Sequence, residues 1–227
     1  RSANTAAMPS YGIVIHGGAG TILSRDLPPA LEARYRAQLG EALDAGHAVL
    51  KRGGGGLDAV VAAITILEDS PLFNAGKGAV LNSAGVCELD AAIMDGRTQA
   101  AGAVAGVRHI RNPIKLARDV MAKSAHVMLA GRGAEQFARE IGHTLVPSRY
   151  FLTARRQKQL ALAKQLEKSA GDPSRGLIAI LTIDDNKFGT VGAVALDRRG
   201  HLAAGTSTGG MTNKKFGRVG DSPIIGA

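Results

Sequence analysis

The sequence predicts a layered domain of mixed helices and strands, of the α+β or α/β kind. Segments with helical periodicity alternate with short apolar runs typical of strands. Apolar residues make up 45% of the 227 residues, which is ample for the core of one large or two small domains. Glycine is abundant at 30 residues and aromatic residues are scarce at 4%, so we expect a core of small aliphatic side chains with closely passing backbones.

The first two thirds of the chain mix both kinds of element. A short apolar run at 11–16 predicts a strand that ends in a glycine turn. Residues 28–51 carry apolar side chains on one face, and 57–67 are mostly apolar, so both segments predict helices, separated by four glycines at 53–56. Further strands are predicted at 79–82, 87–94, 100–107 and 126–129, with helices beginning at Pro113, capped by Asn112, and spanning 134–141.

The last third begins with a basic helical pattern at 153–168 and continues with linker-like residues at 169–176. Three strands follow, at 177–183, 190–197 and 202–207. The final residues, 222–227, read as the beginning of another strand, and a sheet edge ending there would be unusual. We therefore expect the native polypeptide to continue.

Composition excludes several classes of protein. The longest apolar runs, such as 59–67, are too short for a membrane span of about 20 residues. A single cysteine, Cys87, excludes an internal disulfide and a cysteine-based zinc site, and the six histidines show no pair at metal-ligand spacing. Residues 1–7 lack the apolar core of a signal peptide and are expected to be an added tag or a disordered start.

The net charge of +9 suggests a nucleic-acid partner, but its distribution argues against one. Residues 149–175 hold seven basic and two acidic residues, which gives +5 of the total. We interpret this stretch as part of a mobile, solvated linker covering about 150–189. A basic-segment binding protein remains the alternative from a different class.

Two short motifs suggest hydrolase or phosphate chemistry without meeting its requirements. Gly205-Thr206-Ser207-Thr208-Gly209 fits the G-x-S-x-G nucleophile elbow, but no histidine follows His201 and the next residues are turn-like. Gly76-Lys77-Gly78 lacks the serine or threonine of a phosphate loop, and the glycines at 53–56 could hold an anion at the next helix. We interpret the first segment as a strand end with small residues, and the glycine loops as structural turns.

A third motif carries more information because of its position. Thr190 begins a predicted strand, Gly189 precedes it, and the blocks Thr206–Lys214 and Gly217–Pro223 follow. Together with Ile15–Gly20, Leu72–Gly78 and Glu88–Ala91, these blocks resemble the plant-type L-asparaginase/isoaspartyl peptidase family of N-terminal nucleophile hydrolases. The resemblance covers about residues 11–227.

This resemblance implies a four-layer αββα sandwich in one domain, with an α segment at 8–189 and the start of a β segment at 190–227, apparently lacking its C-terminal part. It implies self-cleavage between Gly189 and Thr190. The hydroxyl of Thr190 would then be the nucleophile, and its freed α-amine would be the base, because an α-amino group ordinarily has a pKa of about 7.7–8.0. The implied substrates are L-asparagine and β-aspartyl dipeptides.

The resemblance also assigns supporting residues. Thr208 would support the nucleophile and Asn74 would act in processing. Arg218 would bind the substrate carboxylate, Asp221 its ammonium group, and Gly210 would line the pocket. A sodium ion would be held by the main-chain carbonyls of Leu67, Glu68, Ser70, Phe73, Ala75 and Lys77.

No cofactor is expected for catalysis. The family's partner arrangement implies a homodimer of αβ units, with neither nucleic acid nor membrane as partner, and we expect a cytoplasmic protein, with the periplasm as an alternative. A glycosylasparaginase-like hydrolase is the rival enzyme, although Gly189 and the Gly209-Gly210 pair favour the asparaginase branch. The family's oxyanion donors would lie beyond residue 227, so an inactive truncated form is a further alternative.

Overall fold

The computed structural model describes residues 10–18, 27–170 and 189–227. Its centre is one six-stranded sheet in the order β1-β5-β6-β2-β3-β4. All neighbouring strands are antiparallel except β3 and β4, which run parallel. The strands are β1 (Gly12–His16), β2 (Leu89–Asp95), β3 (Ala101–Val107), β4 (Met128–Ala130), β5 (Val191–Leu196) and β6 (Leu202–Thr208).

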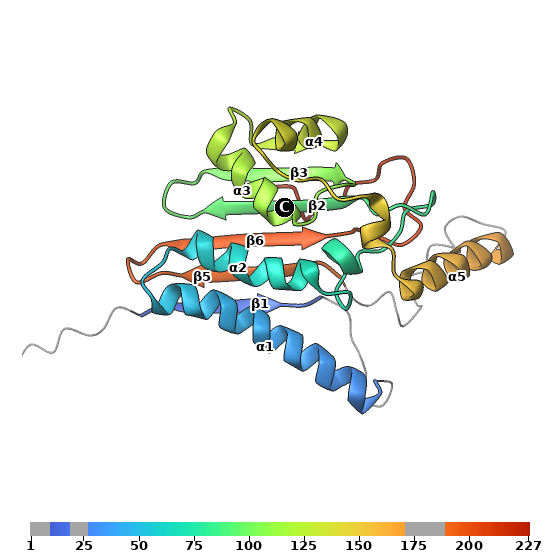
Figure 1. Cartoon of the computed structure of the whole chain (residues 1–227), viewed down its shortest axis with the longest axis horizontal. Coiled ribbons are helices and arrows are strands. Elements are labelled where there is room, and N and C mark those ends of the chain that lie inside the picture. The colour runs from blue at the N-terminus through green and yellow to red at the C-terminus, as the bar shows by residue number, and fades with distance from the viewer. Residues whose placement is uncertain (1–9, 19–26, 171–188) are drawn as a thin grey trace, which may run out of the picture.

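Helices cover one face of this sheet (Figure 1). Helices α1, α2 and α3 lie across that face, α4 lies beside β3 and β4, and α5 extends beyond the ends of the strands. Their bounds are α1 (Pro29–Lys51), α2 (Gly56–Asp69), α3 (Pro113–Lys123), α4 (Gly131–Glu140) and α5 (Ala154–Ala170), with short 3₁₀ turns η2 (Gly76–Gly78) and η3 (Ser148–Phe151).

Glycine allows the helices to approach the sheet closely. A Cβ placed on Gly205 of β6 would lie 2.8 Å from Val60 of α2 and 3.1 Å from Ile114 of α3. A Cβ on Gly46 of α1 would lie 2.4 Å from Ile13 of β1. The high glycine content therefore brings backbones together here, and the core consists largely of Ala, Val, Leu and Ile, as the composition predicted.

The opposite face of the sheet is exposed along β1, β5 and the first part of β6, whereas Ala92 of β2 and Ala103 of β3 are buried on it. Val14, Val194 and Leu202 expose 73%, 49% and 54% of their surface there. The ladder registers place Val14, Val194 and Ala204 on one row, and His16, Gly192 and Thr206 on the next. The described residues thus form two layers, one of helices and one of sheet.

Most of the predicted elements are present, with shifts of a few residues at their ends. The strand predicted at 79–82 is wrong, because these residues form no strand. Their backbone is held by irregular bonds instead: Val80 N–H donates to Asn74 Oδ1 and Asn213 N–H donates to the carbonyl of Leu81. The strand start predicted at 222–227 is also wrong, since these residues form turns. The strand predicted at 177–183 lies outside the described residues.

The predicted mobile linker is partly wrong. Of residues 150–189, the portion up to 170 is mostly helix α5, which the basic helical pattern had indicated. Two of its basic side chains make internal contacts. Arg156 is 1% exposed, and its Nε donates to the carbonyl of Gly78 at 2.7 Å. Arg155 donates to the Tyr35 hydroxyl. Part of the local charge excess therefore anchors α5 to the loop that follows α2.

No helix in the described part of the chain combines the length and the apolar character needed to cross a membrane.

Candidate active site

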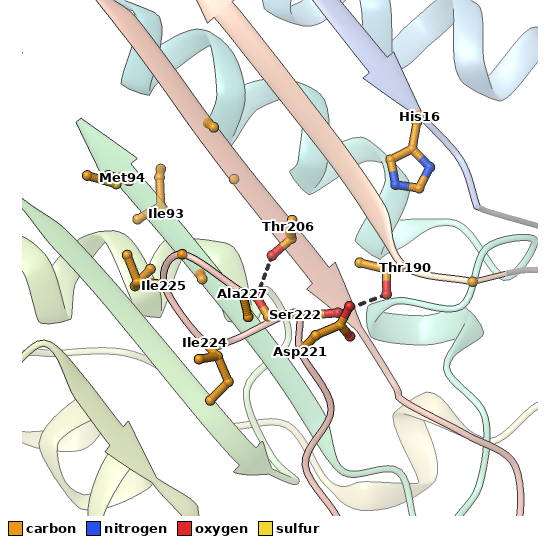
Figure 2. Close-up of a pocket in the computed structure, with 15 residues that line it drawn as sticks. His16, Ile93, Met94, Thr190, Thr206, Asp221, Ser222, Ile224, Ile225 and Ala227 are labelled. Carbon is orange, nitrogen blue, oxygen red and sulfur yellow. Dashed lines mark hydrogen bonds between the residues drawn. The ribbon is translucent and has the colours of Figure 1, made fainter. Parts of the chain in front are cut away.

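Thr190 lies immediately before β5, on the open face of the sheet. It is half-buried and lines a pocket of about 520 Å³ together with Gly189, His16, Thr206, Asp221 and Ser222. Figure 2 shows the Thr190 side chain directed toward the turn that carries Asp221 and Ser222. The antiparallel ladder places this residue here, because Val191 pairs with Ser207 and Gly192 with Thr206.

Three hydroxyl-bearing residues are linked within this pocket. Thr190 Oγ1 and Ser222 Oγ lie 2.9 Å apart, within hydrogen-bond distance. Thr206 Oγ1 donates to the main-chain carbonyl of Ser222 at 2.8 Å. The turn at 221–222 is therefore fastened to β6 on one side and to the candidate nucleophile on the other.

Asn74, Thr208 and Gly210 form a second connected group at the end of β6. Asn74 Nδ2 donates to the carbonyl of Gly210 at 2.8 Å, and Gly210 N–H donates to Thr208 Oγ1 at 3.0 Å. Gly209 fits tightly between them, because a Cβ there would lie 2.7 Å from Asn74 Oδ1. These three predicted residues meet one another, but none of them lines the pocket of Thr190.

Arg218 and Asp221 do not share one pocket in this structure. Asp221 lines the pocket of Thr190, whereas Arg218 lines a neighbouring cavity of about 620 Å³ with Glu88, Arg108 and Lys214. The resemblance assigns both residues to one substrate, but their side chains line different pockets in the described arrangement. Both residues are exposed, on a turn that contains Gly217 with φ at +69°.

Buried charges lie beside the second cavity. Lys214 is 6% exposed, its Nζ donates to the carbonyl of Glu88, and burial lowers its pKa despite the opposing charges of Asp90 and Glu88. Burial raises the pKa of Asp90, whose Oδ1 accepts the N–H of Gly106. A Cβ on Gly210 would lie 3.2 Å from Lys214 Nζ, so this charge cluster adjoins the Asn74 group.

The loop predicted to bind sodium is compatible with a hard cation. The carbonyl of Leu67 has no helical partner because residue 71 is proline, and Leu72 N–H donates to Ser70 Oγ instead of to the carbonyl of Glu68. Both oxygens lie at the negative end of α2. A Cβ on Gly76 would lie 2.2 Å from the Glu68 oxygen, so only glycine allows the loop to close around it.

The carboxyl group of Glu68 is fully buried. Its Oε1 accepts hydrogen bonds from Ser207 Oγ at 2.7 Å and from Ile114 N–H at 3.0 Å. Burial raises its pKa to about 8, against the effect of those two hydrogen bonds. Ser207 is thus a buried residue inside β6 and not an exposed serine on a strand-to-helix turn, which removes the nucleophile-elbow interpretation.

Among the described residues, no group of three or more His, Cys, Asp or Glu side chains could hold a metal ion. The pocket residue that sequence reasoning missed is Ser222, which contacts the Thr190 hydroxyl directly. The available signal was its place after Asp221 in a glycine-rich turn. Its contact depends on how that turn folds back onto β6, and residue order does not show this.

Comparison with known proteins identifies the class to which this fold and pocket belong. The sequence profile of a family described as "Asparaginase" matches residues 9–227. An "Isoaspartyl peptidase" of Salmonella typhimurium is 49% identical over 215 residues, covering 95% of this chain and 67% of the relative. The corresponding protein of Escherichia coli K12 is 49% identical, covering 95% and 66%. An "Isoaspartyl peptidase/L-asparaginase" of Mus musculus is 47% identical, covering 96% and 63%.

The chain belongs to the asparaginase family. It spans about two thirds of the length of these curated relatives. The resemblance drawn from the ordered sequence motifs is therefore confirmed at the level of the family.

Proposed function

We propose that this protein is a self-cleaving amidohydrolase that acts on L-asparagine and β-aspartyl dipeptides, with Thr190 as its nucleophile. The observation that carries the proposal is the position of Thr190. It follows a glycine, precedes a strand of the central sheet, and opens into a pocket that also contains a carboxylate, Asp221. The names of the relatives support the same substrates.

In the continuous chain, the nitrogen of Thr190 is part of a peptide bond. Self-cleavage would begin when its hydroxyl attacks the carbonyl carbon of Gly189, which has no side chain to hinder the approach. The C–N bond breaks, the nitrogen takes up the proton from the hydroxyl, and the Gly189 acyl group is left as an ester on Thr190. Water then hydrolyses the ester, which releases a Gly189 carboxylate and a free Thr190 with its own α-amine.

In each turnover the α-amine would take the proton of the Thr190 hydroxyl as the oxygen attacks the β-carbonyl of the substrate. The protonated α-amine then gives that proton to the leaving nitrogen as the C–N bond breaks, so that ammonia leaves from asparagine, or an amino acid leaves from a β-aspartyl dipeptide. A β-aspartyl ester remains on Thr190. Water hydrolyses it to aspartate and regenerates the hydroxyl. One residue thus supplies both the nucleophile and the general base.

Both substrates present the same acyl part, with a free α-amine and α-carboxylate. Asp221, in the pocket of Thr190, suits the ammonium group, and Arg218 suits bidentate binding of the carboxylate. Since Arg218 lines the neighbouring cavity, its side chain would have to turn toward Thr190 when substrate binds. Flanking glycines at 217 and 220 leave the turn free to allow this.

We further propose the finer features that the family implies. A sodium ion would bind the carbonyls of the loop after α2. The open face of the sheet, with Val14 and Val194 exposed, is where the second sheet of a four-layer sandwich would pack. A homodimer of αβ units and a cytoplasmic location belong to the same proposal, with the periplasm as the alternative.

Mass spectrometry of the freshly purified protein over time would test the proposed function. We expect the intact mass to give way to two fragments that meet at Gly189 and Thr190. Release of ammonia from L-asparagine and of leucine from β-aspartyl-leucine should rise in parallel with the fragments. Thr190→Ala should abolish both the fragments and the activity.

Thr190→Ser is the matched variant, because it keeps the hydroxyl and removes only a methyl group. It should still cleave, whereas Thr190→Ala should not. A protein that remains intact and hydrolyses neither substrate would overturn the proposal, as would full activity in Thr190→Ala.

A further inference from the structure

One carboxyl oxygen joins three elements of the core. Glu68 lies in the last turn of α2 and is fully buried. Its Oε1 accepts the hydroxyl of Ser207 on β6 at 2.7 Å and the main-chain N–H of Ile114, in the first turn of α3, at 3.0 Å. Asn112, which precedes α3, donates from its side-chain amide to Asp69, the residue that follows Glu68. The end of α2 therefore fixes the start of α3 and the strand β6 at one point.

Ser207 occupies the part of β6 closest to the candidate nucleophile. It pairs in the ladder with Val191, the residue directly after Thr190. Its side chain points to the helical face, so the side chains of its neighbours Thr206 and Thr208 point to the open face. Thr206 holds the turn that carries Ser222, and Thr208 accepts the N–H of Gly210. A displacement at Ser207 would move both groups.

At Gly205 the contacts between β6 and the helices are apolar and have little directional preference. Beneath Gly205 the packing is against the methyl groups of Val60 and Ile114. Such contacts resist separation, but they resist small sliding movements less strongly than a buried hydrogen bond with fixed geometry. Within the described residues, the Glu68–Ser207 bond is the side-chain hydrogen bond that joins β6 to α2.

Glu68 also begins the loop that leads to Asn74. Its main-chain oxygen packs against Gly76, where a Cβ would lie only 2.2 Å away. Asn74 lies between these two residues in the sequence and bonds to the carbonyl of Gly210. Glu68 is therefore linked to the Asn74 group through the loop and to the Thr190 pocket through Ser207.

We propose that Glu68 is a positioning residue for the reaction: through its hydrogen bond to Ser207 it sets the position of β6, and with it the hydroxyl groups around Thr190. The inference rests on the proposed function. Glu68 touches neither the candidate nucleophile nor the pocket, so it acts through Ser207. Loss of the bond should slow chemistry more than it weakens substrate binding.

The test compares Ser207→Ala, Glu68→Ala, Glu68→Gln and the double alanine variant, assayed well below the Tm of each. Ser207→Ala should lower kcat for β-aspartyl-leucine and the rate of self-cleavage about tenfold, since sub-ångström misplacement is costly, and leave KM within about twofold. Glu68→Gln, which keeps the acceptor oxygen, should restore most of kcat. In the Glu68→Ala background, Ser207→Ala should have little additional effect.

Thr65→Val is the control for hydroxyl removal. Thr65 lies on α2, and its Oγ1 is buried with no hydrogen-bond partner among the described residues. Its replacement should leave kcat unchanged. If Glu68→Ala fails to fold, Ser207→Ala and Glu68→Gln still decide the question.

Wild-type kcat in Ser207→Ala would overturn the inference, as would additive losses in the double variant. A loss that follows Tm, with kcat and KM changing together, would also overturn it, since that indicates a structural role alone. Failure of the proposed function looks different. In that case the wild-type protein is inactive, or Thr190→Ala retains activity.

Discussion

The hydroxyl oxygens of Thr190 and Ser222 lie 2.9 Å apart, although 32 positions separate them in the chain. Thr190 is held by the β5–β6 ladder, and Ser222 is held by the bond from Thr206 to its carbonyl. A nucleophile whose hydroxyl has a fixed partner loses fewer rotamers when it attacks, because its orientation is set in advance. This contact makes Ser222 part of the candidate site.

Ser222→Ala should slow both self-cleavage and turnover. Removal of the Ser222 hydroxyl leaves the Thr190 hydroxyl without this partner, and we expect the rates of self-cleavage and turnover to fall on the order of tenfold. The measurement is the half-life of the intact chain by mass spectrometry, followed by kcat on β-aspartyl-leucine. Ser169→Ala is the control, because among the described residues that hydroxyl bonds to the carbonyl of Gln165 within its own helix. Equal rates in the two variants would exclude a role for Ser222.

Asn74→Asp should impair processing more than Asn74→Ala does. Asn74 Nδ2 donates to the carbonyl of Gly210, and a carboxylate at this position would repel that oxygen while still accepting the N–H of Val80. We expect self-cleavage to slow on the order of a hundredfold in the aspartate variant, through displacement of the loop at 208–210. Quantifying the fragments over several days checks this. If the alanine variant is the slower one, repulsion is not the cause.

Gly205→Ala should destabilise the fold. The added Cβ would lie 2.8 Å from Val60 and 3.1 Å from Ile114, and overpacking of this kind costs about 1–3 kcal/mol. Urea unfolding should show a lower midpoint. The double variant Gly205→Ala/Val60→Ala should recover part of the loss, because the smaller side chain makes room.

Gly12→Ala serves as the control for that experiment, since a Cβ there meets nothing within 4 Å. Its unfolding midpoint should equal the wild-type value or exceed it slightly. A tolerated Gly205→Ala would mean that α2 and α3 can move away from β6 without loss of stability.

Glu135 should contribute to stability in a pH-dependent way. Burial by itself would raise its pKa, but hydrogen bonds from the main-chain N–H of Arg108 and from the side chain of His109 outweigh burial and lower the pKa. The stabilisation is therefore present above the unfolded pKa of about 4.3 and is lost as pH falls through the lower folded pKa.

Thermal unfolding of the wild type and Glu135→Gln between pH 3 and pH 7 tests this prediction. The difference in Tm should be largest near neutral pH and should shrink as the medium becomes acidic. A difference in Tm that stays constant across this range would show that the charge of the Glu135 carboxylate is not the source of the stabilisation.

Much of the fold could be predicted from local sequence signals. Apolar periodicity and glycine stops indicated helices such as α1, because such spacing reflects one buried face, whereas a helical pattern of basic residues indicated α5. The interpretation of residues 150–170 as part of a mobile linker failed for a physical reason. A basic composition suggests a solvated face, yet Arg156 is buried on the carbonyl of Gly78, a partner 78 positions away.

The candidate site shows the same division. The resemblance carried by the ordered motifs predicted Thr190, Gly189 and Asp221 as site residues, and all three line one pocket in the structure. The positions of the site residues relative to one another could not be predicted from local patterns. The tertiary structure grouped Asn74 with Thr208 and Gly210, put Arg218 in a separate cavity, and added Ser222.

The sequence by itself determined the family, the mixed helices and strands, and the residue types available for hydrolysis. Only the tertiary structure decided which of them meet. Hydrogen bonds between residues far apart in the chain depend on how β5, β6 and the 221–222 turn pack, and no local pattern encodes that packing. The buried contact between Glu68 and Ser207, 139 positions apart, is the clearest instance.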